Sequence, residues 1–195
     1  MLSTESYTFA TSIGAARHPA RQLWAEHAYP GEQPLGVLPV PAAILGTAFF
    51  PGGYGLLASA PGSELPAFPF GGVMVLGHDF HSEVGYRRSL ERNGESHLQP
   101  TWRNILKLLA QASIPTDDCF FTNFFMGLRQ GTNTIGVFPG STSKPYVEHC
   151  RRFLLRQLEV QRPRLVLTLG IHTPYLVAPM SPELAPWQMR QGRCV

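Results

Sequence analysis

The chain has 195 residues, of which 44% are hydrophobic and 15% charged, and 16 basic against 13 acidic residues give a formal charge of +3. An apolar content this high with so little net charge excludes charge-driven disorder and predicts a folded domain of ordinary size. The weak positive charge permits a nucleic-acid partner but does not by itself indicate one. The three cysteines form no CxxC pair and predict neither a disulfide framework nor a structural zinc site.

The pattern of apolar residues gives no signal for secretion or for a membrane span. Residues 1–24 lack the charged-then-apolar order of a secretory signal. The uncharged segment 33–63 is interrupted by proline and glycine, and its longest apolar run, residues 42–50, is too short to cross about 30 Å of hydrocarbon. We therefore expect a cytoplasmic protein, monomeric and free of membrane contact.

Residues 1–70 are predicted to be an accessory segment packed on the core, with a short helix around 15–27 followed by a Pro/Gly-rich stretch. The α/β domain is predicted to occupy 71–195. Its first strand is the valine-rich run 72–77, which glycine ends. A helix capped by Thr101 follows, with apolar residues at helical spacing until Ile114 and Pro115, and CFFTN at 119–123 predicts the second strand.

A Gly/Thr/Ser-rich loop is predicted from Gly127 to Ser143. Ser143 then caps a helix with Pro145 in its first turn, where a missing N–H is harmless. The run RLVLTLG at 164–170 predicts a third strand, and residues 171–177 are expected to begin a further helix. This order predicts a three-layer α/β/α fold with a short central parallel sheet, whose ligand site lies at the carboxyl ends of the strands.

Polar residues follow the first two predicted strands at that edge. Asp79, directly after a buried strand, is placed to orient or activate a water, although an aspartate in this position can also cap a turn through its own backbone. Asn123 carries an amide that matches the edge of a nucleobase, with a turn role as the alternative. Of the neighbouring phenylalanines we expect Phe80 to line a pocket and most others to be core.

Three segments together resemble the uracil-DNA glycosylase superfamily: GVMVLGHDFH at 72–81, FFTNFFMGLR at 120–129 and CRRFLLRQLEVQRPRLVLTLG at 150–170. Their order and spacing match, and the similarity covers roughly 72–178. The resemblance implies a uracil-DNA glycosylase-like fold and the excision of uracil, or a related damaged base, from DNA in base excision repair.

The resemblance also implies roles for individual residues. Asp79 would be the catalytic carboxylate that positions the hydrolytic water, and Asn123 would bind the extruded base on its pairing edge. His78 falls where the family holds a uracil carbonyl through a backbone amide. His81 replaces a tyrosine that excludes the thymine methyl in one branch, and Gly77 and Phe80 complete the expected base pocket.

Cleavage of the N-glycosidic bond builds positive charge on the sugar and negative charge on the base, so a carboxylate and hydrogen-bond donors are both needed. The base must also be flipped out of the stack. Phosphate contacts are expected from the 127–144 loop, with Arg129, Ser141 and Lys144 as candidates, although an ordinary connecting loop is an equal alternative.

The chain departs from the family in two respects. Only Cys150 occupies a position used by members with an iron–sulfur cluster, so no cluster, metal or other cofactor is expected. The family's final His-Pro-Ser-like motif is not found beyond Val177, which predicts a member lacking its C-terminal part and with reduced or no activity.

Two alternatives remain open. One is a non-catalytic DNA- or nucleobase-binding module on the same fold. The other is a metal-dependent hydrolase in which His78, Asp79, His81 and His172 gather an ion.

Overall fold

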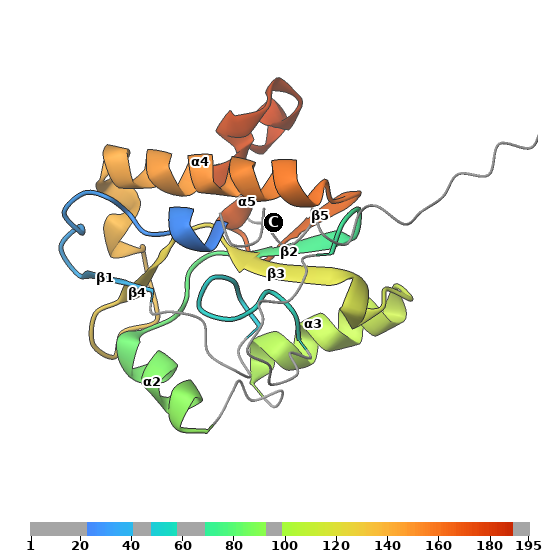
Figure 1. Cartoon of the computed structure of the whole chain (residues 1–195), viewed down its shortest axis with the longest axis horizontal. Coiled ribbons are helices and arrows are strands. Elements are labelled where there is room, and N and C mark those ends of the chain that lie inside the picture. Colours follow the sequence, from blue (N-terminus) through green and yellow to red (C-terminus); the bar gives the residue numbers. More distant parts are fainter. Residues whose placement is uncertain (1–22, 41–47, 58–68, 93–98, 189–195) are drawn as a thin grey trace, which may run out of the picture.

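Three parallel strands form the centre of the computed structural model, which describes residues 23–40, 48–57, 69–92 and 99–188 (Figure 1). They are β2 (Val73–Gly77), β3 (Cys119–Asn123) and β5 (Leu165–Thr168). Their spatial order is β3-β2-β5, with Val73 opposite both Cys119 and Leu165. All three strands were predicted from their apolar runs, and the prediction of a small parallel sheet is confirmed.

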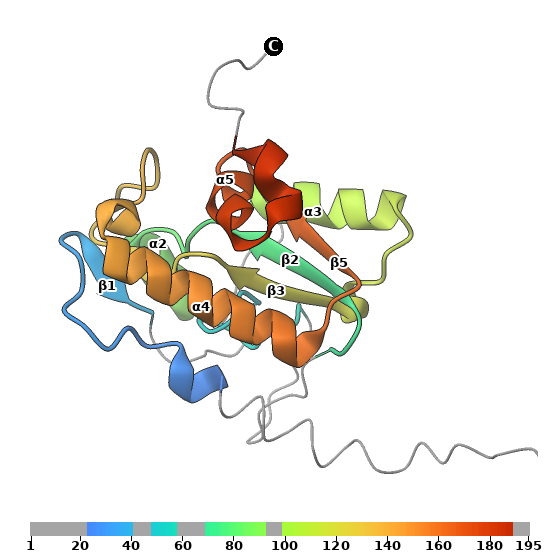
Figure 2. The ribbon, with the colours of Figure 1, turned by 90° about the horizontal axis from the view of Figure 1, so that it is seen from above.

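Two long helices cover the two faces of this sheet. The helix α4 (Lys144–Gln161) lies on one face and α3 (Pro100–Gln111) on the other (Figures 1 and 2). Successive side chains of a strand point to opposite faces, and the core divides accordingly. Met74 and Leu76 pack in one apolar cluster with residues of α4, whereas Val73 and Val75 pack in a second cluster with residues of α3. The three layers therefore follow from strands that are apolar at every position.

The helix starts agree with the sequence in one case and differ in the other. Ser143 is the N-cap residue of α4, as predicted, although its side chain makes no capping hydrogen bond, and Pro145 lies in the first turn. The predicted cap at Thr101 is wrong, because α3 already begins at Pro100 and Gln99 is its N-cap residue. Proline favours the first helical position because its fixed φ suits the helix and its missing N–H has no partner there.

Several short elements complete the described chain. The predicted loop 127–143 is wrong in part, because it begins with a strand, β4 (Gly127–Arg129), and ends in a 3-10 turn, Pro139–Thr142. The helix α2 (Glu83–Glu91) follows β2 and was not predicted. After β5 come α5 (Thr173–Val177), as expected, and two 3-10 helices, Ala178–Met180 and Pro182–Trp187, while a further 3-10 turn, Thr116–Asp118, precedes β3.

The described part of residues 1–70 shares its core with the rest of the chain. The strand β1 (Val37–Pro39) pairs antiparallel with β4, in register from Val37 opposite Arg129. Phe50 forms a parallel bridge with Thr122 and is fully buried, as is Leu23. Residues 23–26 are helical, the predicted helix 15–27 is wrong at His27, which is not helical, and 15–22 lie outside the described residues. The described parts of this segment are therefore integral to the core that they share with the sheet.

Among the helices that the structure describes, none has the length and apolar character required to cross a bilayer.

Candidate functional site

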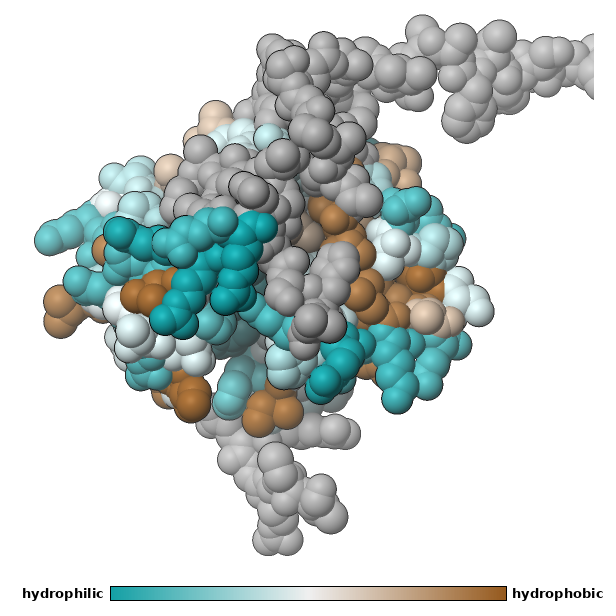
Figure 3. Space-filling view, turned by 90° about the horizontal axis from the view of Figure 1, so that it is seen from below, coloured by the Kyte–Doolittle hydropathy of each residue, from teal (hydrophilic) through white to brown (hydrophobic). Residues whose placement is uncertain are grey.

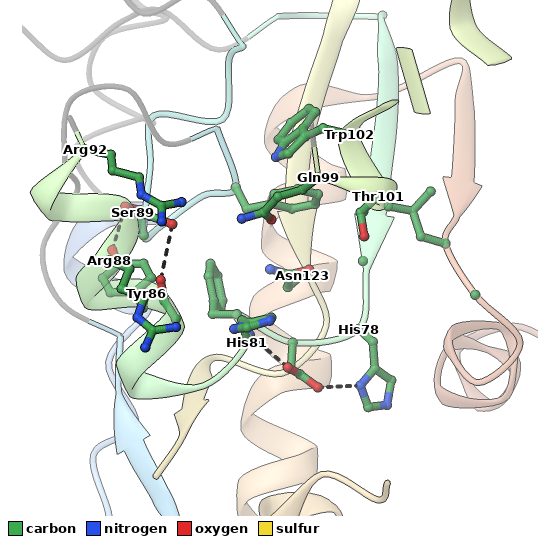
Figure 4. Close-up of a pocket in the computed structure, with 18 residues that line it drawn as sticks. His78, His81, Tyr86, Arg88, Ser89, Arg92, Gln99, Thr101, Trp102 and Asn123 are labelled. Carbon is green, nitrogen blue, oxygen red and sulfur yellow. Dashed lines mark hydrogen bonds and ion pairs between the residues drawn. The ribbon is translucent and has the colours of Figure 1, made fainter. Parts of the chain in front are cut away.

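A hollow of about 520 Å³ lies at the carboxyl ends of β2 and β3, where the sequence placed the site (Figure 4). Small-molecule sites in proteins usually measure about 300–1,000 Å³, so the volume admits a ligand of nucleotide size. The turn Gly77–His81 and Asn123 form its floor, and α2 and the start of α3 form its sides. Asp79 and Asn123 thus line one common hollow, as the sequence analysis required.

The carboxylate of Asp79 is held by three neighbours. Its Oδ2 accepts hydrogen bonds from His78 Nδ1 at 2.8 Å and from Arg129, at 2.8 Å for Nη2 and 3.3 Å for Nε. Its Oδ1 accepts the His81 N–H at 2.9 Å. Burial is the largest influence and alone would raise the pKa of Asp79, but the bonds from His78 and Arg129, the charge of Arg129 and the His81 N–H lower the pKa to about 2. Asp79 is therefore ionised at neutral pH.

The bond from the His81 N–H is also the local turn that sequence reasoning offered as the alternative role for Asp79. An aspartate that bonds the N–H two residues ahead closes a turn on itself. His81 has a left-handed φ of 76°, which is uncommon outside glycine. Asp79 thus shapes the turn with one oxygen while it meets Arg129 with the other, and its side chain still borders the hollow.

Arg129 lies in a different environment from the one expected of a phosphate contact. Its side chain is only 6% exposed, because β4 carries it inside the molecule. Besides Asp79, the guanidinium donates to the carbonyls of Gly136 at 3.0 Å and Val137 at 3.1 Å, and it lies 5.5 Å from the centre of the Phe138 ring. This burial argues against contact with DNA, and makes Arg129 the partner that holds Asp79 in its charged form.

The other two predicted phosphate contacts lie away from the hollow. Ser141 is in the 3-10 turn before α4, and Lys144 is exposed at the first position of α4. Neither residue lines the hollow that Asp79 and Asn123 share. Contact of these two side chains with DNA stays a prediction.

Asn123 ends β3 and is a buried residue whose side-chain amide has no hydrogen-bond partner among the described residues. The residue is 3% exposed, and its side chain makes no hydrogen bond with any described residue. Gly77, its neighbour in the register of β2, makes the room: a Cβ at position 77 would lie 2.1 Å from Asn123 Oδ1. Figure 4 shows the amide between His81 on one side and Gln99 and Trp102 on the other. A buried amide with unmet hydrogen-bonding capacity is a binding group for a polar ligand.

The two histidines of the turn differ in their surroundings. The ring of His78 packs edge-on against Phe125, with centroids 5.1 Å apart, while its Nδ1 faces Asp79. Burial is the main cause that lowers the pKa of His81, with Arg129 acting in the same direction and Asp79 opposing it. The ring of His81 fits only because residue 85 of α2 is glycine, where a Cβ would lie 2.1 Å from His81 Nδ1.

The walls of the hollow are partly aromatic. Phe80 lines it and is 7% exposed, in the position expected from the sequence, and Gly77, His78 and His81 line it as well. Sequence reasoning missed the contributions of other segments, because they come from elements that long-range packing brings to the strand ends. These further lining residues include Phe49, Tyr86, Arg88, Arg92, Gln99 and Trp102.

The metal-dependent alternative has no support in the part of the chain that the structure describes. No group of three or more histidine, cysteine, aspartate or glutamate side chains there is arranged to hold an ion. His172 lies near His78, with ring centroids 6.1 Å apart, but the side chain of His78 is turned to Asp79.

No protein-family model matches the chain, and a search of curated proteins finds no protein similar to it. The functional interpretation therefore depends on the chemistry of the hollow and on the resemblance of its sequence segments.

Proposed function

We propose that this chain is a uracil-DNA glycosylase-like enzyme that hydrolyses the N-glycosidic bond of uracil, or of a related damaged base, in DNA during base excision repair. The observation that carries the proposal is that an ionised carboxylate, Asp79, and an unpartnered amide, Asn123, border one hollow at the strand ends. These two groups are the ones that the segmental resemblance assigns to catalysis and to base recognition.

Base recognition follows from the donors and acceptors on the floor of the hollow. The amide of Asn123 offers both an N–H₂ donor and an oxygen acceptor, which match the adjacent N–H and carbonyl of uracil. The backbone N–H of His78 donates to no described residue, so it is free for a second carbonyl of the base. The rings of Phe80 and Trp102 give apolar walls for a planar ligand. For a base flipped out of the DNA duplex, these contacts would replace the hydrogen bonds and stacking that it loses there.

The low pKa of Asp79 favours electrostatic stabilisation over general-base catalysis as its role. A carboxylate with a pKa of about 2 is a weak base, so it is not suited to remove a proton from water at neutral pH. Its negative charge instead favours the positive charge that grows on the sugar as the bond breaks. Arg129 bonds to Oδ2 of Asp79 and not to Oδ1. Among the described residues Oδ1 accepts one hydrogen bond, from the His81 N–H, and it therefore retains capacity to orient a water molecule.

The experiment is release of uracil from a single-stranded oligonucleotide under single-turnover conditions. We expect the wild type to release uracil and Asp79→Asn to be slower by at least about 100-fold, because charge stabilisation in the transition state is lost. Asp117→Asn is the matched control, since Asp117 is exposed and does not line the hollow. Release by Asp79→Asn at the rate of the wild type would refute the assignment.

A second candidate function is a DNA- or nucleobase-binding module without turnover. It is favoured by the ion pair of Asp79 with Arg129, because a buried guanidinium 2.8 Å away offsets much of the charge that catalysis would need. The same assay separates the two functions. Specific binding of the uracil-containing strand, with no release by the wild type, would indicate the module.

A further inference from the structure

Two arginines border the hollow, and no described acidic residue forms an ion pair with either of them. Arg88 and Arg92 are exposed, and both line it from the side formed by α2 (Figure 4). Neither forms an ion pair or a side-chain hydrogen bond with any residue that the structure describes. Arg87, which directly precedes Arg88, differs in both respects, because it pairs with Glu83 at 2.7 Å and does not line the hollow.

The position of the two arginines is fixed by the way α2 is anchored. The Tyr86 hydroxyl donates to the Gly52 carbonyl at 2.8 Å, and the Val84 N–H donates to the Gly131 carbonyl at 3.2 Å. Arg92 directly follows the last residue of α2, and its N–H donates to the Arg88 carbonyl at 3.3 Å, so the helical turn continues and places both arginines on the side of the hollow. Seen from below, hydrophilic residues gather on the face of the molecule where α2 lies (Figure 3).

Two like charges four residues apart destabilise a helix unless an anion lies between them. The charge within the hollow does not relieve this, because Asp79 is already paired with Arg129. The hollow is therefore neutral at its floor and cationic at one wall. Such a distribution attracts an anion whose uncharged part enters the hollow.

We propose that Arg88 and Arg92 bind the phosphate of a nucleotide whose base occupies the hollow against Asn123. The proposal rests on the proposed function in taking a nucleotide as the occupant, and it adds a phosphate site at the C-terminal end of α2 to the contacts expected from Ser141 and Lys144. The phosphate belongs either to the occupying nucleotide itself or to the strand that flanks it. Arginine suits this task because its planar fork of donors matches phosphate oxygens.

The test is binding of a labelled, uracil-containing single-stranded oligonucleotide to the full chain at several salt concentrations. For single strands, log K falls with log salt by about 0.7 per phosphate contact. The double variant Arg88→Ala/Arg92→Ala should bind about tenfold more weakly in dilute salt, with a slope reduced by about 0.7 because one phosphate contact is lost. Arg87→Ala, the matched control, should change affinity by less than about twofold, because its charge is used within α2.

Two further arms separate the sources of the phosphate. The first compares deoxyuridine monophosphate with deoxyuridine: a preference for the monophosphate that disappears in the double variant identifies the phosphate of the occupying nucleotide. An effect of the double variant on the oligonucleotide alone identifies the flanking strand. Either result supports the proposal, whereas equal affinity and equal salt slope in wild type and double variant overturn it, as does failure of the wild type to bind either ligand.

Uracil release measured on the same proteins keeps this proposal distinct from the proposed function. Binding that depends on Arg88 and Arg92, without release by the wild type, would retain the phosphate site and reject the glycosylase. Release by the wild type with a salt slope that the double variant leaves unchanged would retain the glycosylase and reject the phosphate site.

Discussion

The side chain of Asp79 has two roles: it closes the turn after β2 and it carries a negative charge at the edge of the hollow. The two roles are compatible because each uses a different oxygen: Oδ1 accepts the His81 N–H, and Oδ2 accepts hydrogen bonds from His78 and Arg129. Burial of Arg129 makes this pairing strong, and it also makes each partner depend on the other.

The lowered pKa of Asp79 predicts a stability that depends on pH. The folded protein binds this proton less readily than the unfolded chain, because the pKa falls from 3.8 to about 2. The resulting stabilisation is complete above about pH 4 and is lost as the pH falls towards 2, and it amounts to about 2 kcal/mol. Urea denaturation of wild type and Asp79→Asn should give unfolding free energies whose difference shrinks between about pH 6 and pH 2.5. A difference that stays constant over this range would contradict the ion pair.

Gly77 is predicted to act through Asn123. In Gly77→Ala the new Cβ would lie 2.1 Å from Asn123 Oδ1, so the amide must leave its place on the floor of the hollow. We expect Gly77→Ala and Asn123→Ala each to slow uracil release by about 10-fold or more, and the double variant to add little, since both changes remove the same interaction. Rates measured in a double-mutant cycle check this. Additive effects of the two changes would contradict the shared role.

Asp79 and Asn123 could be predicted as site residues from the sequence because each lies at the end of an apolar run, and the strand ends of a parallel sheet lie at one edge. It did not predict the burial of Arg129. That burial depends on the pairing of β1 with β4, and the two strands are far apart in the chain and only three residues long.

The edge strand β3 of the sheet is covered by backbone hydrogen bonds from residues 48–57. Its outer edge meets residues 48–57: the Phe50 N–H donates to the Phe121 carbonyl at 2.9 Å, and the Phe121 N–H donates to the Gly55 carbonyl at 2.8 Å. An edge strand left uncovered exposes unpaired backbone groups, so this segment completes the sheet on that side. The Pro/Gly-rich composition of the segment gave no sign of the role.

Gly55 is predicted to be required for this cover. It has a φ of +81°, and a Cβ there would lie 2.1 Å from the Phe120 ring. Gly131, with a φ of +76° and no atom within 4 Å of its Cβ position, provides the control. Both alanine substitutions should carry the left-handed backbone cost of about 1–2 kcal/mol, and Gly55→Ala should add about 1–3 kcal/mol of overpacking. Denaturation curves test the difference, and equal losses in the two variants would contradict the contact.

Helix α2 was missed for a related reason. Its sequence, EVGYRRSLE, has few apolar residues and an internal glycine, which lowers helix propensity by about 1 kcal/mol relative to alanine. Contacts outside the helix hold it instead, such as the bond from Tyr86 to Gly52. Prediction was accurate where an element carries its own signal, as in α4, and failed where tertiary contacts stabilise it.

In the whole molecule, the described part of the first 70 residues belongs to the same folding unit as the sheet. Leu23 and Phe50 are fully buried and Val37 is 4% exposed, all within the apolar cluster on the α4 side. The three-layer order could be predicted because the apolar pattern of each strand and helix can be recognised in the sequence. The packing of residues 23–57 on this core could not be predicted, since no local sequence pattern indicates which residues they contact.

Removal of residues 1–70 should therefore unfold the remainder. Burial of each large apolar side chain contributes about 1.5–3 kcal/mol to stability. The combined loss for Leu23, Val37 and Phe50 is therefore comparable with the free energy of unfolding of a whole domain, usually about 5–15 kcal/mol. We expect the fragment 71–195 to show no cooperative thermal transition by circular dichroism. A cooperative transition close to that of the full chain would mean that the segment is dispensable.

The central claim is that Asn123 and its neighbours bind a pyrimidine in the hollow, and the most direct measurement is the NMR signal of the Asn123 side-chain amide during titration with free uracil. We expect this signal to shift and saturate, Asn123→Ala to lose uracil binding, and the exposed amide of Asn104 on α3 not to respond. Uracil binding that leaves the Asn123 amide unchanged, or that survives Asn123→Ala, would show that Asn123 does not recognise the base.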